Sequence, residues 1–185
     1  MSAVTRFPKL RRRLTLPAAV AAVAALAVAP QAASARDCHN TGSDPNEVSL
    51  HKVQTATLCL VNNARRHSGL PRLHENHRLD SSSMRYARAM ARHDFFEHGD
   101  FLGRIKRSNY LSGAGAWTVG ENIAWGAGPY ATPKGIFRMW MDSPPHRANI
   151  LSRHFHEIGI GIARGAPRDG VSGGATYATD FGSRG

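Results

Sequence analysis

The C-terminal part of the chain constrains the fold most. Ile158 to Ala163 alternates isoleucine with glycine, a period of two that indicates a β-strand. After a basic, glycine-rich stretch, Ala175 to Phe181 predicts the returning strand of an antiparallel hairpin. Residues 103–120 are punctuated by glycine and predict mostly loop or a short helix, and a glycine loop follows through Gly126 and Gly128. Earlier segments have helical spacing, and we expect helices at about 47–67, 80–95 and 132–142, with a short helical turn at 146–151. Helices followed by an antiparallel pair predict an α+β domain.

The first 35 residues have the three parts of a secretory signal peptide. Five basic residues precede an unbroken apolar run at 18–29, and Ala33-Ser34-Ala35 forms a small-x-small cleavage site. A membrane anchor is the alternative, but the run is too short, because a spanning helix needs about 20 apolar residues. We therefore expect a protein that is secreted, extracellular or associated with the cell wall, with no transmembrane segment. Arg11-Arg12-Arg13 leaves open whether export uses the general or the twin-arginine route.

Cleavage after Ala35 leaves 150 residues, enough for one domain with a proper core. Residues 36–46 are polar and turn-rich and predict a lead-in, so the domain spans 47–185. Removing the five basic residues of the leader lowers the formal net charge from +11 to +6. This modest charge is weak evidence for nucleic acid, and we expect none as a partner. It favours anionic partners at the cell envelope, such as acidic wall polymers or lipid headgroups. We expect a monomer.

Cys38 and Cys59 are the two cysteines of the chain, and both follow the cleavage site. In an oxidising compartment an isolated pair usually forms a disulfide. We expect a Cys38–Cys59 bridge that joins the start of the mature chain to the first helix.

Two histidines and one glutamate differ from the other titratable residues in their settings. His98 follows an aromatic pair at the end of a helix, and His146 follows a Pro-Pro break. Glu121 is an isolated acid in an uncharged stretch, and burying an unpaired carboxylate is costly, so it needs a partner. From composition alone, three unrelated residues remain the simpler interpretation.

A set of motifs changes that interpretation. The following segments occur in this order: Leu60-Val61-Asn62, Arg65, Gly69-Leu70-Pro71-x-Leu73, Phe96-Glu97-His98, Gly120-Glu121-Asn122-Ile123-Ala124, Trp140 to Leu151, Phe155-x-Glu157-Ile158-Gly159-Ile160-Gly161, and Tyr177 to Gly182. Over residues 48–182 the chain resembles the bacterial branch of the CAP superfamily (cysteine-rich secretory proteins, antigen 5 and pathogenesis-related 1), the SCP-like extracellular domains. The block at 140–161 is the most specific part of the resemblance.

The resemblance implies a three-layer α-β-α sandwich with a central antiparallel sheet and a cleft where histidines and acids converge. The cleft residues of the family fall on His98, Glu121 and His146. A second glutamate of eukaryotic members falls on Ser143, so the full set of four is absent, and the neighbouring Asp142 is a possible cleft acid. Two histidines and a carboxylate can ligate zinc or another divalent metal and leave one position open.

Three functions fit these residues. The cleft binds an extracellular ligand (a lipid, a wall polymer or a peptide), with or without a divalent metal. Alternatively, His98, Glu121 and His146 perform metal-assisted or acid–base hydrolysis outside the cell. The third hypothesis is a surface scaffold with a vestigial cleft. The absent second glutamate favours binding or a scaffold over catalysis, so whether the protein is an enzyme stays open.

Overall fold

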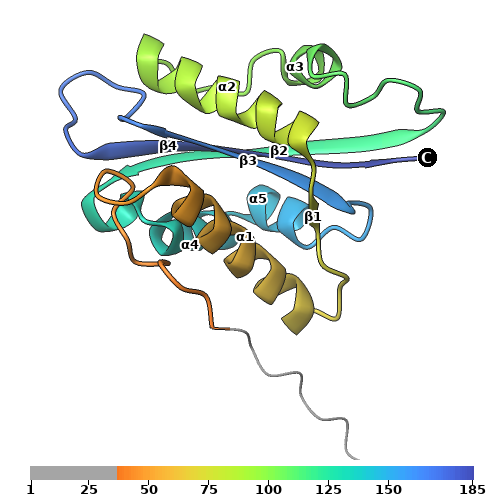
Figure 1. The fold of residues 1–185 in the computed structure, drawn as a ribbon, viewed down its shortest axis with the longest axis horizontal. Helices are drawn as coiled ribbons and strands as arrows, with labels where there is room; N and C mark the ends of the chain where they lie inside the picture. The colour runs from red at the N-terminus through yellow and green to blue at the C-terminus, as the bar shows by residue number, and fades with distance from the viewer. Residues whose placement is uncertain (1–36) are drawn as a thin grey trace, which may run out of the picture. The chain divides into compact units, whose positions relative to one another are not determined.

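The computed structural model describes residues 37–185 (Figure 1). The predicted signal peptide, residues 1–35, lies outside this range and stays a prediction. Every described helix and strand belongs to one compact unit, and the described core lies within residues 37–185. Within the described part of the chain, no helix has the length and apolar character needed to cross a membrane.

Four strands form one sheet in the order β1-β3-β4-β2. They are β1 (His74–Glu75), β2 (Trp117–Ala127), β3 (Glu157–Arg164) and β4 (Gly174–Arg184). The predicted hairpin is confirmed, since β3 and β4 pair antiparallel with Ile160 opposite Thr179. Strand β2 also pairs antiparallel with β4. The short β1 pairs parallel with β3, so the sheet is mixed and not purely antiparallel as expected.

Helices cover both faces of this sheet, as the α+β three-layer prediction requires (Figure 1). Helices α2 (His77–His93) and α3 (Phe101–Arg107) lie on one face. The other face carries α1 (Leu50–His67), α4 (Pro133–Asp142) and α5 (Pro144–Ile150), with the short 3₁₀ helix η1 (Gly128–Ala131) before α4. The larger core cluster fills this second interface, where Trp140 packs edge-to-face on Tyr177 and Phe155 stacks on Phe181. Burial of such aromatic side chains is a dominant stabilising contribution.

The predicted start of the second helix was wrong. The helix begins at His77 and not near residue 80, because the side chain of Asn76 caps it by accepting hydrogen bonds from the backbone N–H groups of Arg78 and Leu79. Asp80 lies inside the helix and accepts a hydrogen bond from the Ile160 N–H at 2.8 Å. It therefore ties the helix to the sheet.

The glycine-based loop predictions were wrong at both ends of residues 117–127, because these residues form strand β2. The two glycines that suggested a loop are required by packing. A Cβ at Gly120 would lie 2.8 Å from a ring atom of Phe155, and one at Gly126 would lie 2.4 Å from the backbone oxygen of Tyr130. Glycine inside a strand often marks such a close approach.

The glycines of the predicted strand at 158–163 have the same kind of role. A Cβ at Gly159 would lie 2.0 Å from the backbone carbon of Leu79, and one at Gly161 would lie 2.1 Å from that of Ser83. The backbone of α2 thus rests directly on β3. This close approach holds α2, and the segment that follows it, against the sheet.

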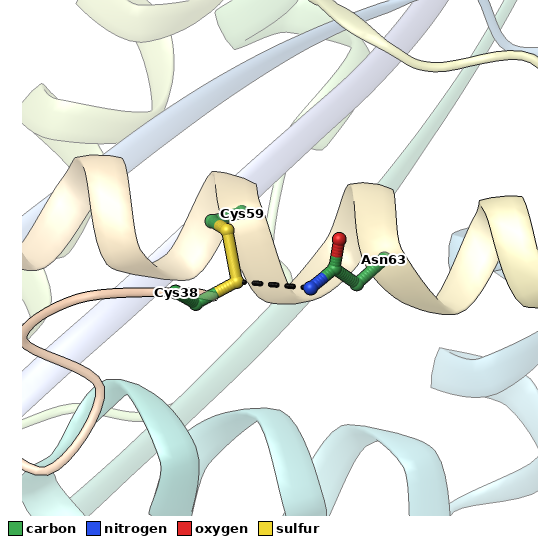
Figure 2. The surroundings of a disulfide bond; sticks show 3 residues. All are labelled: Cys38, Cys59 and Asn63. Carbon is green, nitrogen blue, oxygen red and sulfur yellow. Dashed lines mark hydrogen bonds between the residues drawn. A yellow bond between two sulfur atoms is a disulfide. The ribbon is translucent and has the colours of Figure 1, made fainter. Parts of the chain in front are cut away.

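The predicted disulfide joins Cys38 to Cys59, with 5.7 Å between the two Cα atoms. Figure 2 shows the bridge between the N-terminal segment and α1, where the Asn63 amide group donates to the sulfur of Cys38 at 3.1 Å. Closing a loop of 21 residues stabilises a fold by about 3 kcal/mol in the chain-entropy description.

Arg65 is fully buried and connects α1 to the segment after α5. Its guanidinium donates to four backbone carbonyl groups, those of Pro71, Ile150, Ser152 and Phe155. Burial lowers the pKa of Arg65 from its ordinary value. Its role in this fold is structural, because it satisfies carbonyl groups that would otherwise be buried without donors.

Candidate functional site

Glu121 is the acid at the centre of the candidate cleft. It lies in β2, directly after Gly120 and one residue before Asn122, and its side chain is only 2 % exposed. One carboxylate oxygen, Oε1, lies 2.8 Å from Nδ1 of His98. The other oxygen, Oε2, accepts a hydrogen bond from Nη2 of Arg104. Both oxygens of this buried carboxylate are therefore engaged, and its charge is balanced by a guanidinium.

Arg104 is the partner of Glu121 that the sequence analysis missed. It lies in α3, whose N-terminus is capped by Asp100. Its Nη1 donates to the His98 carbonyl at 2.8 Å, and its guanidinium lies over the Tyr86 ring, 3.2 Å from the centroid. The ring and the two hydrogen bonds fix the plane of the guanidinium. The isolation of Glu121 in sequence was the signal that a cation had to lie nearby.

His146 belongs to α5, on the opposite face of the sheet from α3. Its Nδ1 lies 2.9 Å from Oγ of Ser143, the residue before the helix, which fixes the orientation of the imidazole. Burial, and then the charge of His98, lower the pKa of His146, so its ring is neutral at pH 7. The two histidines are thus close enough to interact electrostatically, while each is held by a different layer.

An asparagine pair joins α5 to β2 and so brings the two layers together. The Asn122 amide group donates to the His146 carbonyl at 2.9 Å. Asn149 donates to the Glu121 carbonyl at 3.0 Å and to the side-chain oxygen of Asn122 at 2.9 Å. Asn122 is fully buried. Asn122 thus supports the site from strand β2. Trp140 fills the core.

Asp180 is a second acid near Glu121 that sequence analysis did not select. It pairs with Glu121 across β2 and β4 and is 1 % exposed, and neither of its carboxyl oxygens makes a hydrogen bond of good geometry within residues 37–185. Burial, reinforced by the charge of Glu121, raises the pKa of Asp180 to about 8, although Ser82 and Arg104 oppose the shift. The carboxyl is therefore protonated at neutral pH. An acid inside the apolar segment 175–181 was the signal in sequence.

The structure brings His98, Glu121 and His146 together but places Asp142 elsewhere. Asp142 is the last residue of α4, is exposed, and lines a separate hollow with residues that include Tyr130 and Arg138. The geometry gives no support to Asp142 as a cleft acid.

The hypothesis that His98, Glu121 and His146 hold a metal ion stays a prediction. As they are arranged, these residues do not fit a divalent cation, because Arg104 and His98 already engage both oxygens of Glu121. The fixed positive charge of Arg104 also opposes a second cation beside the same carboxylate. Among the described residues, no group of three or more His, Cys, Asp or Glu side chains has an arrangement that could hold a metal.

The fold and these motifs define a CAP domain. Residues 58–179, about two thirds of the chain, match the family described as the cysteine-rich secretory protein family, and the chain belongs to this family. One relative is a protein of Bacillus subtilis described as uncharacterized protein YkwD, 32 % identical over 130 residues. The match covers 70 % of this chain and 49 % of YkwD, so the chain spans about half the length of that relative.

Solved structures confirm the fold. An extracellular protein containing an SCP domain from Bacillus anthracis superposes with a TM-score of 0.54 at 21 % identity, over 72 % of this chain and 43 % of that one. An outer surface protein from Borrelia burgdorferi superposes with a TM-score of 0.61 at 15 % identity, over 75 % and 97 % of the two chains. A cysteine-rich secretory protein from Staphylococcus aureus gives 0.53 at 19 % identity, over 75 % and 38 %.

Proposed function

We propose that this CAP domain is exported and binds an extracellular ligand at the cleft of His98, Glu121 and His146, without a metal ion. The observation that carries the proposal is the double engagement of Glu121 by Arg104 and His98. The positive charge of Arg104 balances the negative charge of the Glu121 carboxylate within the protein. This arrangement leaves the imidazoles as the groups that donate to or accept from a polar ligand.

The positions of the two imidazoles support binding. The His98 side chain is 53 % exposed, and its Nδ1 is occupied by Glu121, so its Nε2 is the nitrogen available to a ligand. The Nδ1 of His146 is occupied by Ser143 in the same way. Each ring is thus held by one nitrogen and offers the other, which is an arrangement that orients a bound group without further reorganisation.

Zinc titration calorimetry on residues 36–185 tests the metal-free part of the proposal. We expect no stoichiometric zinc binding by the wild-type domain. Two variants are titrated beside the wild type. Arg104→Gln removes the cation from Glu121. His98→Ala/His146→Ala is the control that lacks both imidazoles. A tight wild-type site that is lost in the control would overturn the metal-free proposal and favour metal-assisted hydrolysis.

Export is tested separately. Residues 1–40 are fused to a phosphatase that is active only outside the cytoplasm, and the matched control replaces the five basic residues of the leader with glutamine. We expect phosphatase activity for the native leader and a loss for the control. An inactive fusion to the native leader would refute export by this segment.

A further inference from the structure

A hollow between α2 and α3 is rich in basic side chains. Its volume is about 310 Å³. Three arginines and no carboxylate line it. The lining residues are Ser82, Arg85, Tyr86, Ala89, Arg104 and Arg107. Figure 1 shows α2 and α3 on the same side of the sheet. The hollow is therefore separate from the α1, α4 and α5 layer.

The positive charge of this hollow is only partly balanced. Arg104 is paired with Glu121, which lies on the sheet beneath. Arg107 is paired with Asp100 at 3.3 Å, but both side chains are well exposed, and such surface pairs contribute little. Arg85 bonds to a neutral group, the Ser81 hydroxyl, at 2.5 Å. Arg85 thus retains an uncompensated charge, and Arg107 is available to an incoming anion.

A buried donor that lines the hollow lacks an acceptor. Nε of Arg104 is buried and makes no hydrogen bond of good geometry within residues 37–185. A buried donor without a partner costs about 1–3 kcal/mol, so native proteins rarely keep one without a reason. An oxyanion in the hollow would offer an acceptor oxygen to this group.

We propose that the hollow binds a phosphate group of an extracellular ligand through Arg85, Arg104 and Arg107. Guanidinium groups match phosphate oxygens with paired, charge-assisted hydrogen bonds. The Tyr86 ring holds Arg104 in place beforehand, so ordering that side chain adds little cost on binding. The apolar Ala89 and the ring of Tyr86 line the remaining space, which suits the carbon skeleton attached to the phosphate.

The binding test uses residues 36–185 labelled with ¹⁵N, and follows the arginine Nε–Hε signals during titration with inorganic phosphate at about 100 mM NaCl. We expect saturable shifts and an affinity loss of about tenfold or more in Arg85→Gln/Arg107→Gln. The matched control is Arg88→Gln/Arg92→Gln, which removes the same charge from α2 but outside the hollow. We expect that control to change the affinity by less than about twofold.

Two outcomes would overturn the proposal: the absence of saturable binding, or an equal loss in both double variants, which would indicate diffuse surface charge. Glycerol 3-phosphate and phosphatidylglycerol vesicles then separate a soluble phosphate ester from a lipid headgroup, and both require the same two arginines. His146→Ala should leave phosphate affinity unchanged, so failure of the proposed cleft function and failure of this inference are distinguishable.

Discussion

Asp180 offers the sharpest test of the electrostatics around Glu121. Its carboxyl is buried opposite Glu121, and its pKa is raised to about 8 by burial and by that neighbouring charge. Asn has the shape of the protonated acid and cannot ionise. We therefore expect Asp180→Asn to leave the fold intact and to make its stability less dependent on pH.

The sign and size of the effect follow from proton linkage. In the unfolded chain Asp180 loses its proton near its ordinary pKa of 3.8, whereas the folded protein keeps it until about pH 8. Between these values the folded state binds one more proton, so the free energy of unfolding falls as pH rises, by about 1.4 kcal/mol per pH unit. At pH 7 the accumulated cost is on the order of 4 kcal/mol, and Asp180→Asn removes it.

Urea unfolding of residues 36–185 at pH 4.5, 6 and 7.5 measures this difference. We expect the stability of Asp180→Asn relative to wild type to grow with pH, while the exposed control Asp169→Asn shows no such trend. Comparing each variant with wild type cancels the titration of the histidines. A difference that stays constant from pH 4.5 to 7.5 would refute a raised pKa for Asp180, and a carboxyl ¹³C titration would then give its true value.

Three further changes are each measured by urea unfolding of the same domain. Cys38→Ser/Cys59→Ser should lose about 3 kcal/mol of stability, and an unchanged midpoint would show that the bridge adds nothing. Gly161→Ala should lose about 3 kcal/mol or more, because its Cβ would meet the α2 backbone, whereas Gly42→Ala, with open space around it, should stay within about 0.5 kcal/mol of wild type. Arg65→Met should lose at least about 3 kcal/mol, since four carbonyl groups lose their donor; a smaller loss would mean that water replaces the guanidinium.

The success of sequence reasoning varied with the range of the interactions involved. Helix α4 was predicted at about 132–142 and spans Pro133–Asp142, because its start depends on Thr132 and Pro133, which act over three residues of the same segment. Strand β2 was missed because it is defined by its pairing with β4, about 60 residues away, and because Gly120 and Gly126 look like turn residues when their packing partners are unknown. The role of Gly120 depends on Phe155, which is far from it in the sequence and which no local pattern connects to it.

The candidate site shows the same division. The family motifs marked His98, Glu121 and His146 individually, and the structure brings them together. They did not reveal Arg104, which binds Glu121 from a helix 17 residues earlier, or Asp180, which lies opposite Glu121 in the sheet. Charge balance in a buried cluster depends on every group within a few ångströms, and that set is defined only when the layers pack.

By itself, the sequence determined the α+β class, the hairpin, the CAP resemblance and the pairing of Cys38 with Cys59, because periodicity, motif order and a single cysteine pair are properties of the chain. Only the tertiary structure decided how Glu121 is neutralised, since Arg104 reaches it through the packing of α3 beside Tyr86 of α2. The physical reason is that a buried carboxylate takes its partner from whatever cation the folded layers place beside it, and that placement is a long-range result of packing.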